Sequence, residues 1–262
     1  MSATPTTFVL IQGRRLETRL IAGARADAPA IVMLHEGLGS ISLWRDFPEK
    51  IAAVTGCTVL AYSRHGYGQS DVLDAPRLVE YMHREALDVL PALLDVMRIN
   101  RPVLVGHSDG ASIALIHAAA HSDPRTGVRG VVAMAPHVFV EDVSVKSIAE
   151  AKAAFETTDL PQKLARHHAD SAKTFYGWND IWLHADFRAW NIEACLSSIR
   201  CPLMALQGID DEYGSMAQLE AIAAQAGGPV ELVKLAACKH SPHRDQPEAT
   251  LAAITRFVAS LG

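Results

Sequence analysis

The sequence predicts an α/β protein in which a mostly parallel sheet of about eight strands is covered by helices on both faces. Short apolar runs alternate with helical patterns along most of the 262 residues. These runs are continuous in β-branched and other apolar residues, as is typical of strands that are buried on both sides. About half of the chain is apolar (49%), so it can bury one large core and fold unaided.

The expected elements follow one another in a regular order. The first two runs, at 7–13 and 17–23, are expected to pair as an antiparallel hairpin at the edge of the sheet. The later strands are expected at residues 30–36, 57–63, 102–107, 130–136, 202–208 and 230–236. Helices are expected at about 41–55, 78–98, 109–121, 214–225 and 246–260.

One interval breaks this alternation. Residues 143–198 contain no convincing strand but several helical stretches. An insertion of this length between two strands is uncommon as a plain connection and usually forms a lid or a binding element. We therefore expect a helical cap at 143–198, inserted into an α/β core that comprises 1–142 and 199–262.

Charge and hydropathy exclude several classes of partner. The formal net charge is −5, the pI is near 6.2, and the basic residues are scattered, which argues against nucleic acid and anionic membranes. No apolar stretch approaches the ~20 residues needed to span a bilayer, and the start lacks the features of a signal peptide. The cysteines form no C-x-x-C pair and are expected to be reduced. We expect a cytoplasmic protein, monomeric or homodimeric, that acts on a small-molecule substrate.

The stretch "LVGHSDGASIALIHAA" at 104–119 predicts a nucleophile. A strand-like run turns into a helical pattern at Ser108, with Gly106 and Gly110 two residues before and two after it. Small residues at these places let the backbone approach itself, so that the serine stands at the crest of a sharp turn. This G-x-S-x-G pattern between a strand and a helix is the nucleophile elbow.

A serine hydroxyl needs a base to take its proton, and the base needs a carboxylate to hold it in the right tautomer. The sequence supplies both after later strands, in "GIDDEYG" and in "ACKHSPHRDQPE". Ser108, Asp211 and His240 then follow the chain order of serine, acid and histidine that this architecture uses.

With these motifs the chain resembles the α/β-hydrolase fold family over nearly its whole length. "LHEGLGS" at 34–40 resembles the family's H-G-x-x-G-S loop, and "SRHGYGQSD" at 63–71 resembles its R-G-x-G-x-S loop. The last segment is similar to the ending G-H-x-x-x-x-x-x-P, with Lys239 where glycine is usual. The G-x-S-D-G elbow resembles that of small bacterial hydrolases and valacyclovir-hydrolase-like enzymes. The resemblance implies a serine hydrolase of the carboxylesterase-like branch, with no cofactor and no metal.

The resemblance also separates the candidate acids. The family's acid usually lies three residues after the glycine, so Gly208 indicates Asp211 and leaves Asp210 as a loop carboxylate. Some members carry the acid one strand earlier, and this leaves Glu141 or Asp142 as an alternative.

Several histidines and one arginine receive structural interpretations. The family pattern places the catalytic histidine first, at His240, and His243 is expected to hydrogen-bond the loop. His35 and His107 are expected to be hydrogen-bonded structural residues. Arg64 is expected to organise its loop as a donor.

The resemblance implies an oxyanion hole made of backbone amides. The elbow supplies the amide of Asp109, and the alignment of "LHEGLGS" gives Gly37 as the second donor with Leu38 as its neighbour. Glu36 stands where the family commonly has glycine.

The predicted cap is rich in aromatic residues, and most of them are expected to pack the helical layer. One or two are expected to face the acyl or alcohol pocket, since ligand pockets are largely apolar. The candidates are Phe175, Tyr176, Trp178 and Trp182.

A second pattern in the cap, His167 and His168 with Asp170, is a poor metal site because adjacent helical residues point in different directions.

The sequence therefore predicts hydrolysis of a small carboxylic ester, a thioester or a lactone through an acyl-enzyme on Ser108. A carbon–carbon bond hydrolase of a dienone or diketone is the second candidate, although the cap offers only Arg166 and Arg188 to recognise an acidic substrate tail. A hydrolase-fold receptor with little turnover is the third candidate.

Overall fold

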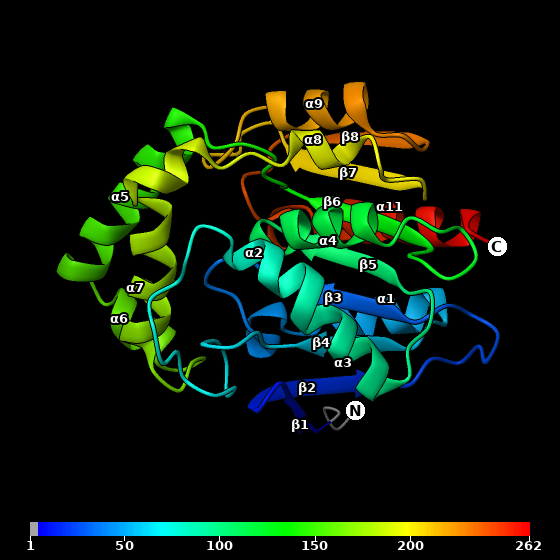
Figure 1. Cartoon of the computed structure of the whole chain (residues 1–262), viewed down its shortest axis with the longest axis horizontal. Helices are drawn as coiled ribbons and strands as arrows, with labels where there is room; N and C mark the ends of the chain where they lie inside the picture. The colour runs from blue at the N-terminus through cyan, green and yellow to red at the C-terminus, as the bar shows by residue number, and fades with distance from the viewer. Residues whose placement is uncertain (1–4) are drawn as a thin grey trace.

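A computed structural model describes residues 5–262; residues 1–4, which the predicted core includes, lie outside the described part of the chain. Eight strands form one sheet in the order β1-β2-β4-β3-β5-β6-β7-β8, and β2 runs antiparallel to both of its neighbours while the other neighbouring pairs are parallel (Figure 1). The strands are β1 (Thr7–Ile11), β2 (Arg14–Ile21), β3 (Ile31–Leu34), β4 (Val59–Tyr62), β5 (Val103–His107), β6 (Gly130–Met134), β7 (Leu203–Gly208) and β8 (Val230–Leu235). The predicted fold class and the antiparallel hairpin are confirmed.

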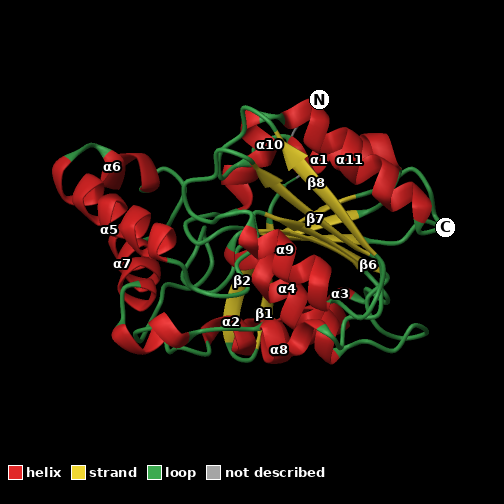
Figure 2. Ribbon diagram, turned by 90° about the horizontal axis from the view of Figure 1, so that it is seen from above, coloured by secondary structure: helices red, strands yellow, loops and turns green. Residues whose placement is uncertain are grey.

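Helices cover both faces of this sheet, as Figure 2 shows. One face carries α1 (Phe47–Thr55), α10 (Pro242–Asp245) and α11 (Pro247–Ser260). The other face carries α4 (Asp109–Ala120), α8 (Glu193–Leu196), α9 (Ala217–Gln225) and a continuous helix made of α2 (Tyr81–Arg84), a π-helical turn (Glu85–Val89) and α3 (Leu90–Met97). A short 3₁₀ helix (Ile41–Trp44) precedes α1.

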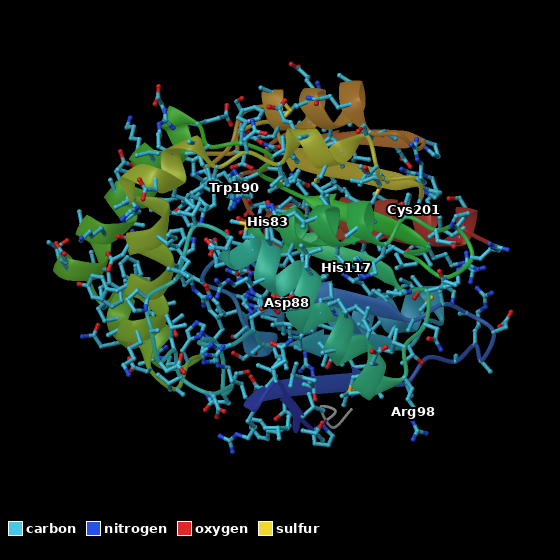
Figure 3. All side chains as sticks on the ribbon, viewed as in Figure 1. His83, Asp88, Arg98, His117, Trp190 and Cys201 are labelled. Atoms are coloured by element: carbon cyan, nitrogen blue, oxygen red, sulfur yellow. The ribbon has the colours of Figure 1, made fainter. Side chains whose placement is uncertain are left out.

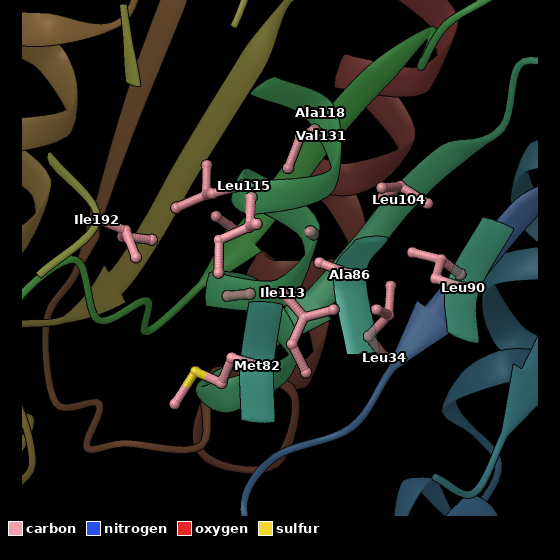
Figure 4. Close-up of a cluster of buried hydrophobic side chains, with 14 of the residues drawn as sticks. Leu34, Met82, Ala86, Leu90, Leu104, Ile113, Leu115, Ala118, Val131 and Ile192 are labelled. Atoms are coloured by element: carbon pink, nitrogen blue, oxygen red, sulfur yellow. The ribbon is translucent and has the colours of Figure 1, made fainter. Parts of the chain in front are cut away.

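The alternation of side chains along the strands builds two separate cores, one on each face of the sheet. In the core under α4, Leu34, Leu104 and Val131 of the sheet lie in one buried cluster with Ile113 and Leu115 of the helix (Figure 4). Nearly every residue of α4 is buried, as is typical of a helix enclosed on all sides. The residue that precedes α4, Ser108, is therefore held on a rigid support.

Strand β8 departs from the expectation that the strands are covered on both faces. It lies at the edge of the sheet and pairs only with β7, and its residues are half-buried or exposed. A continuous apolar run predicts a strand, but it does not show whether that strand lies inside the sheet or at its edge.

The segment predicted as a cap is helical. It contains α5 (Asp142–Thr157), α6 (Leu160–Leu164), α7 (Ser171–Trp182) and a 3₁₀ helix (Ala185–Ala189) before α8. Helices α5, α6 and α7 contact one another and stand to one side of the sheet, whereas α8 packs on α4 and α9 (Figure 1). Side chains fill the space between these helices and the rest of the fold, where Trp190 is labelled in Figure 3. No helix in the described part of the chain is long and apolar enough to cross a membrane.

Candidate active site

Ser108 occupies a strained turn between β5 and α4. Its backbone has φ 53° and ψ −119°, a conformation that is uncommon for a residue with a side chain. A Cβ on Gly106 would lie 2.3 Å from the Gly110 carbonyl oxygen, and a Cβ on Gly110 would lie 2.1 Å from the Leu34 carbonyl oxygen. Close approach between backbone segments therefore requires both glycines, as the sequence predicts.

The structure brings the three predicted triad residues into one hydrogen-bonded chain. His240 Nε2 lies 3.0 Å from Ser108 Oγ, and His240 Nδ1 lies 2.8 and 3.0 Å from the two carboxylate oxygens of Asp211. Asp211 also accepts hydrogen bonds from the amides of Tyr213, at 2.8 Å, and Gly214, at 3.3 Å. The loop that carries the acid thus fixes its orientation toward the imidazole.

Electrostatics within this chain favour an ionised acid beside a basic histidine. Burial on its own raises the pKa of Asp211 and lowers that of His240. Their mutual attraction and hydrogen bond outweigh burial, so the pKa of Asp211 is lowered and that of His240 is raised above its usual value. The carboxylate therefore holds the proton on Nδ1 and leaves Nε2 free to accept one from Ser108.

The alternative acids lie elsewhere. Asp210 is exposed at the surface. Asp142 is also exposed and pairs with Arg188, while Glu141 accepts hydrogen bonds from Ser215. In the described chain none of these carboxylates contacts His240.

The expectation that His243 hydrogen-bonds the loop is wrong. Neither of its ring nitrogens has a hydrogen-bond partner among residues 5–262. Helix α10 instead turns the ring into the core, where it packs 4.8 Å from Trp44, 5.5 Å from Phe47 and 5.1 Å from His107, measured between ring centroids. This burial lowers the pKa of His243 well below its usual value, so the ring is neutral.

The three residues predicted for the oxyanion hole, Gly37, Leu38 and Asp109, line the same cavity as Ser108. Each has a backbone amide that can donate a hydrogen bond. None of the three donates to a protein acceptor within the described residues. Asp109 is the first residue of α4, so its amide stands at the positive end of the helix dipole. These amides are free to bind a negatively charged oxygen.

Glu36, which replaces the family's usual glycine, connects the oxyanion loop to the loop of His240. His107 Nε2 donates to the His240 carbonyl oxygen at 2.7 Å, and His107 Nδ1 lies 3.4 Å from Glu36 Oε2. Arg244 Nη2 lies 3.7 Å from Glu36 Oε1. Burial raises the pKa of Glu36, but His107 and Arg244 lower it well below its usual value. The sequence shows this departure but not the contacts that accommodate it.

His35 is hydrogen-bonded in this loop, as expected, while in the described chain Arg64 donates to the loop of Glu36 and not, as predicted, to its own loop. His35 Nδ1 donates to the Glu36 carbonyl oxygen at 2.7 Å, while its Nε2 accepts from the amide of Arg64 at 3.1 Å. Arg64 Nη2 donates to the Glu36 carbonyl oxygen at 2.9 Å.

The cavity beside Ser108 has a volume of about 180 Å³ and is closed on one side by the predicted cap. Of the four aromatic candidates, Trp178 and Trp182 line it. Phe175 does not: it is fully buried and stacks on Phe155 at 4.0 Å between ring centroids. Tyr176 lines a different cavity, between α7 and residues 73–77.

Sequence reasoning missed five residues that line the cavity: His137, Ile148, Glu212, Tyr213 and Ser241. His137 follows the carboxyl end of β6, and this position is the signal that could have indicated it. Burial, and after it the positive charge that His240 can carry, lower the pKa of His137 to about 3, so the ring is neutral.

The histidine pair in the cap serves two separate hydrogen-bonding roles. His168 Nδ1 accepts from the amide of Gly68 at 3.0 Å, and its Nε2 donates to the Leu38 carbonyl oxygen at 3.1 Å. His167 Nδ1 forms a hydrogen bond with Ser42 Oγ at 2.9 Å. Asp170 caps helix α7 instead of joining the histidines, since it accepts from the amide of its third residue.

An eight-stranded mixed sheet with a serine at a strand-to-helix elbow defines the class of α/β hydrolases. A model of the alpha/beta hydrolase family matches residues 31–254, and the chain belongs to this family.

The individual relatives share low sequence identity with this chain. The chain is 25% identical to 2-succinyl-6-hydroxy-2,4-cyclohexadiene-1-carboxylate synthase from Serratia proteamaculans (strain 568), over 94% of this chain and all of the relative. The crystal structure of an enol-lactonase from Burkholderia xenovorans LB400 is similar, with a TM-score of 0.74 and 20% identity over 97% of this chain and all of that one. A thermophilic esterase from Thermogutta terrifontis gives a TM-score of 0.68 and 17% identity over 98% of this chain and 99% of that one. These two structures share the fold.

Proposed function

We propose that this protein hydrolyses a small, uncharged carboxylic ester, thioester or lactone through an acyl-enzyme on Ser108. The observation that carries this proposal is the hydrogen-bonded chain from Ser108 through His240 to Asp211. It lies beside a cavity lined by Gly37, Leu38 and Asp109, whose amides have no protein acceptor in the described chain.

The geometry supports a reaction in two steps. His240 Nε2 takes the proton of Ser108 Oγ as that oxygen attacks the carbonyl carbon, and His240 then gives the proton to the leaving alcohol. The oxyanion accepts hydrogen bonds from the amides of Gly37 and Asp109. Water, deprotonated by the same nitrogen, next attacks the acyl-enzyme and releases the acid and Ser108.

The charges around the cavity favour an uncharged substrate. Glu36, Asp109 and Glu212 line it, and no lysine or arginine does so among the described residues. Arg64 is the basic group nearest to Asp109, at 4.0 Å, and its side chain is buried. This arrangement argues against a substrate with a carboxylate tail, and thus against the carbon–carbon bond hydrolase. It also argues against the kind of carboxylate that the synthase from Serratia is named for.

A panel of substrates tests the proposal. We expect p-nitrophenyl esters with short acyl chains to be hydrolysed fastest, because a cavity of about 180 Å³ holds only a small group. Lactones, thioesters and a dienone carboxylate complete the panel, with Ser108→Ala as the matched control. Turnover of the dienone alone, or equal ester turnover by Ser108→Ala, would contradict the proposal. Labelling of Ser108 by a fluorophosphonate without turnover of any ester would instead indicate a receptor.

A further inference from the structure

Two tryptophans on successive turns of α7 both line the cavity, but their indole N–H groups differ. Trp182 Nε1 donates to Tyr81 Oη at 3.1 Å and to Asp109 Oδ1 at 3.2 Å. Trp178 is 6% exposed, and its Nε1 donates to no protein acceptor in the part of the chain that the structure describes. An indole nitrogen can only donate, so its partner is either solvent or a bound ligand.

Trp178 Nε1 lies directly against the oxyanion loop. A Cβ on Gly37 would lie 2.1 Å from this nitrogen and 2.4 Å from Cδ1 of the same ring. No side chain fits at position 37 while the indole stays in place. The predicted cap thus brings a hydrogen-bond donor to a residue whose own amide is free.

A second contact from the predicted cap holds the same loop. His168 Nε2 donates to the Leu38 carbonyl oxygen at 3.1 Å, while its Nδ1 is held by the amide of Gly68. The loop of Gly37 and Leu38 is therefore bound from one side by His168 and covered by Trp178.

Unpaired indole groups elsewhere in the chain differ in their surroundings. Nε1 of Trp44 and of Trp190 also lacks a partner among the described residues, but both atoms are fully enclosed by protein and neither residue lines the cavity. Trp178 Nε1 is not enclosed in this way. Its position at the cavity wall allows a substrate atom to reach it.

We propose that the Trp178 indole N–H is a further donor of the oxyanion hole, so that helix α7 completes a site otherwise built by the core. The inference rests on the proposed ester hydrolysis. A carbonyl oxygen has two lone pairs and a tetrahedral oxyanion has three, so an added donor gains its partner as negative charge develops. Such a donor lowers the barrier rather than strengthening substrate binding.

Two replacements of Trp178 test this role in the hydrolysis of p-nitrophenyl butyrate. Trp178→Phe removes the N–H group, and replacing the indole by benzothiophene removes it while keeping the shape of the ring. Both should lower kcat by about 10²-fold, as loss of an oxyanion donor does, with KM little changed. Trp190→Phe, the same change at an indole away from the cavity, should leave kcat unchanged.

Binding of a short trifluoromethyl ketone, which adds to Ser108 as a charged tetrahedral adduct, gives a second readout. Its affinity should fall by a factor similar to that of kcat in both Trp178 variants, while thermal melting shows that the fold is retained. A benzothiophene variant with the kcat of the parent, or a raised KM with unchanged kcat, would overturn the inference while leaving ester hydrolysis intact. If the unmodified protein turned over no ester, the proposed function itself would fail, and the inference with it.

Discussion

The two walls of the cavity are built in different ways. The core wall carries Ser108 on an elbow whose shape comes from backbone segments in close contact, since Gly106 and Gly110 leave no space for a Cβ. The predicted cap wall carries Trp178 and Trp182 on a helix that is held by aromatic packing and by side-chain hydrogen bonds. The predicted triad serine thus stands on the wall whose backbone packing leaves no space for a side chain at two glycines, while the predicted cap wall contributes two indole rings.

The first prediction concerns the acid on the core wall and carries the largest expected effect. Asp211→Asn should lower kcat by about 10⁴-fold with the fold intact, because the amide no longer fixes the tautomer of His240 or stabilises its charged form. Steady-state kinetics together with thermal melting checks this.

Asp210→Asn and Asp142→Asn are the matched controls, since both side chains are exposed and neither contacts His240 in the described chain. Both should retain most of the activity. If Asp142→Asn is inactive and Asp211→Asn keeps its activity, the acid lies one strand earlier, and its assignment to Asp211 is wrong.

The second prediction compares a glycine from each wall. Gly110→Ala should destabilise the fold by about 2–3 kcal/mol, because the new Cβ would lie 2.1 Å from a backbone carbonyl oxygen. Gly177→Ala on α7 should change the free energy of unfolding by less than about 1 kcal/mol, since its Cβ would meet only the end of the Leu73 side chain and alanine favours a helix. Urea unfolding measures both, and equal losses would remove the contrast between the walls.

The same contrast explains what the sequence predicts. The elbow and the order of Ser108, Asp211 and His240 can be predicted from the sequence, because glycine spacing and strand ends are local features of the chain. The contacts within the predicted cap cannot be predicted in this way. Phe175 and Trp178 lie three residues apart, yet Phe175 is enclosed beside Phe155 and Trp178 lines the cavity. Only packing against distant segments separates them.

Two polar residues illustrate the same limit. His243 lies three residues after His240, and the sequence predicts it as a loop residue. Helix α10 instead turns it toward Trp44 and Phe47, which are far away in the sequence. Glu36 departs from the motif, and its partners His107 and Arg244 come from the end of β5 and from α10. Motif comparison shows that a residue differs, whereas its contacts depend on the completed fold.

The third prediction, with the smallest expected effect, concerns pH. The base must be neutral, so kcat/KM should rise with pH through the pKa of His240, which lies above the usual value of about 6.5. The charge of Glu36 contributes to this increase, after the larger effects of Asp211 and Glu212. Glu36→Gln should therefore shift the acidic limb of the profile to lower pH, by less than about one unit.

Several other ionisable groups surround Glu36 and His240, and the Glu36→Gln substitution leaves them unchanged. They are Asp211, Glu212, His137, His107, His243 and Arg244. Glu248→Gln, an exposed change on α11, should leave the limb where it is. If the acidic limb of the kcat/KM profile does not move in Glu36→Gln, Glu36 acts only on the structure of the loop.

The acyl-enzyme on Ser108 is the central claim, and rapid acid quenching with mass spectrometry tests it most directly. After mixing with p-nitrophenyl butyrate, the intact protein should gain the mass of one butyryl group within the first turnover, and peptide mapping should place that group on Ser108. Ser108→Ala should gain none. A butyryl group on another residue, or ester turnover that leaves Ser108 unmodified under conditions where acylation outpaces deacylation, would contradict the account.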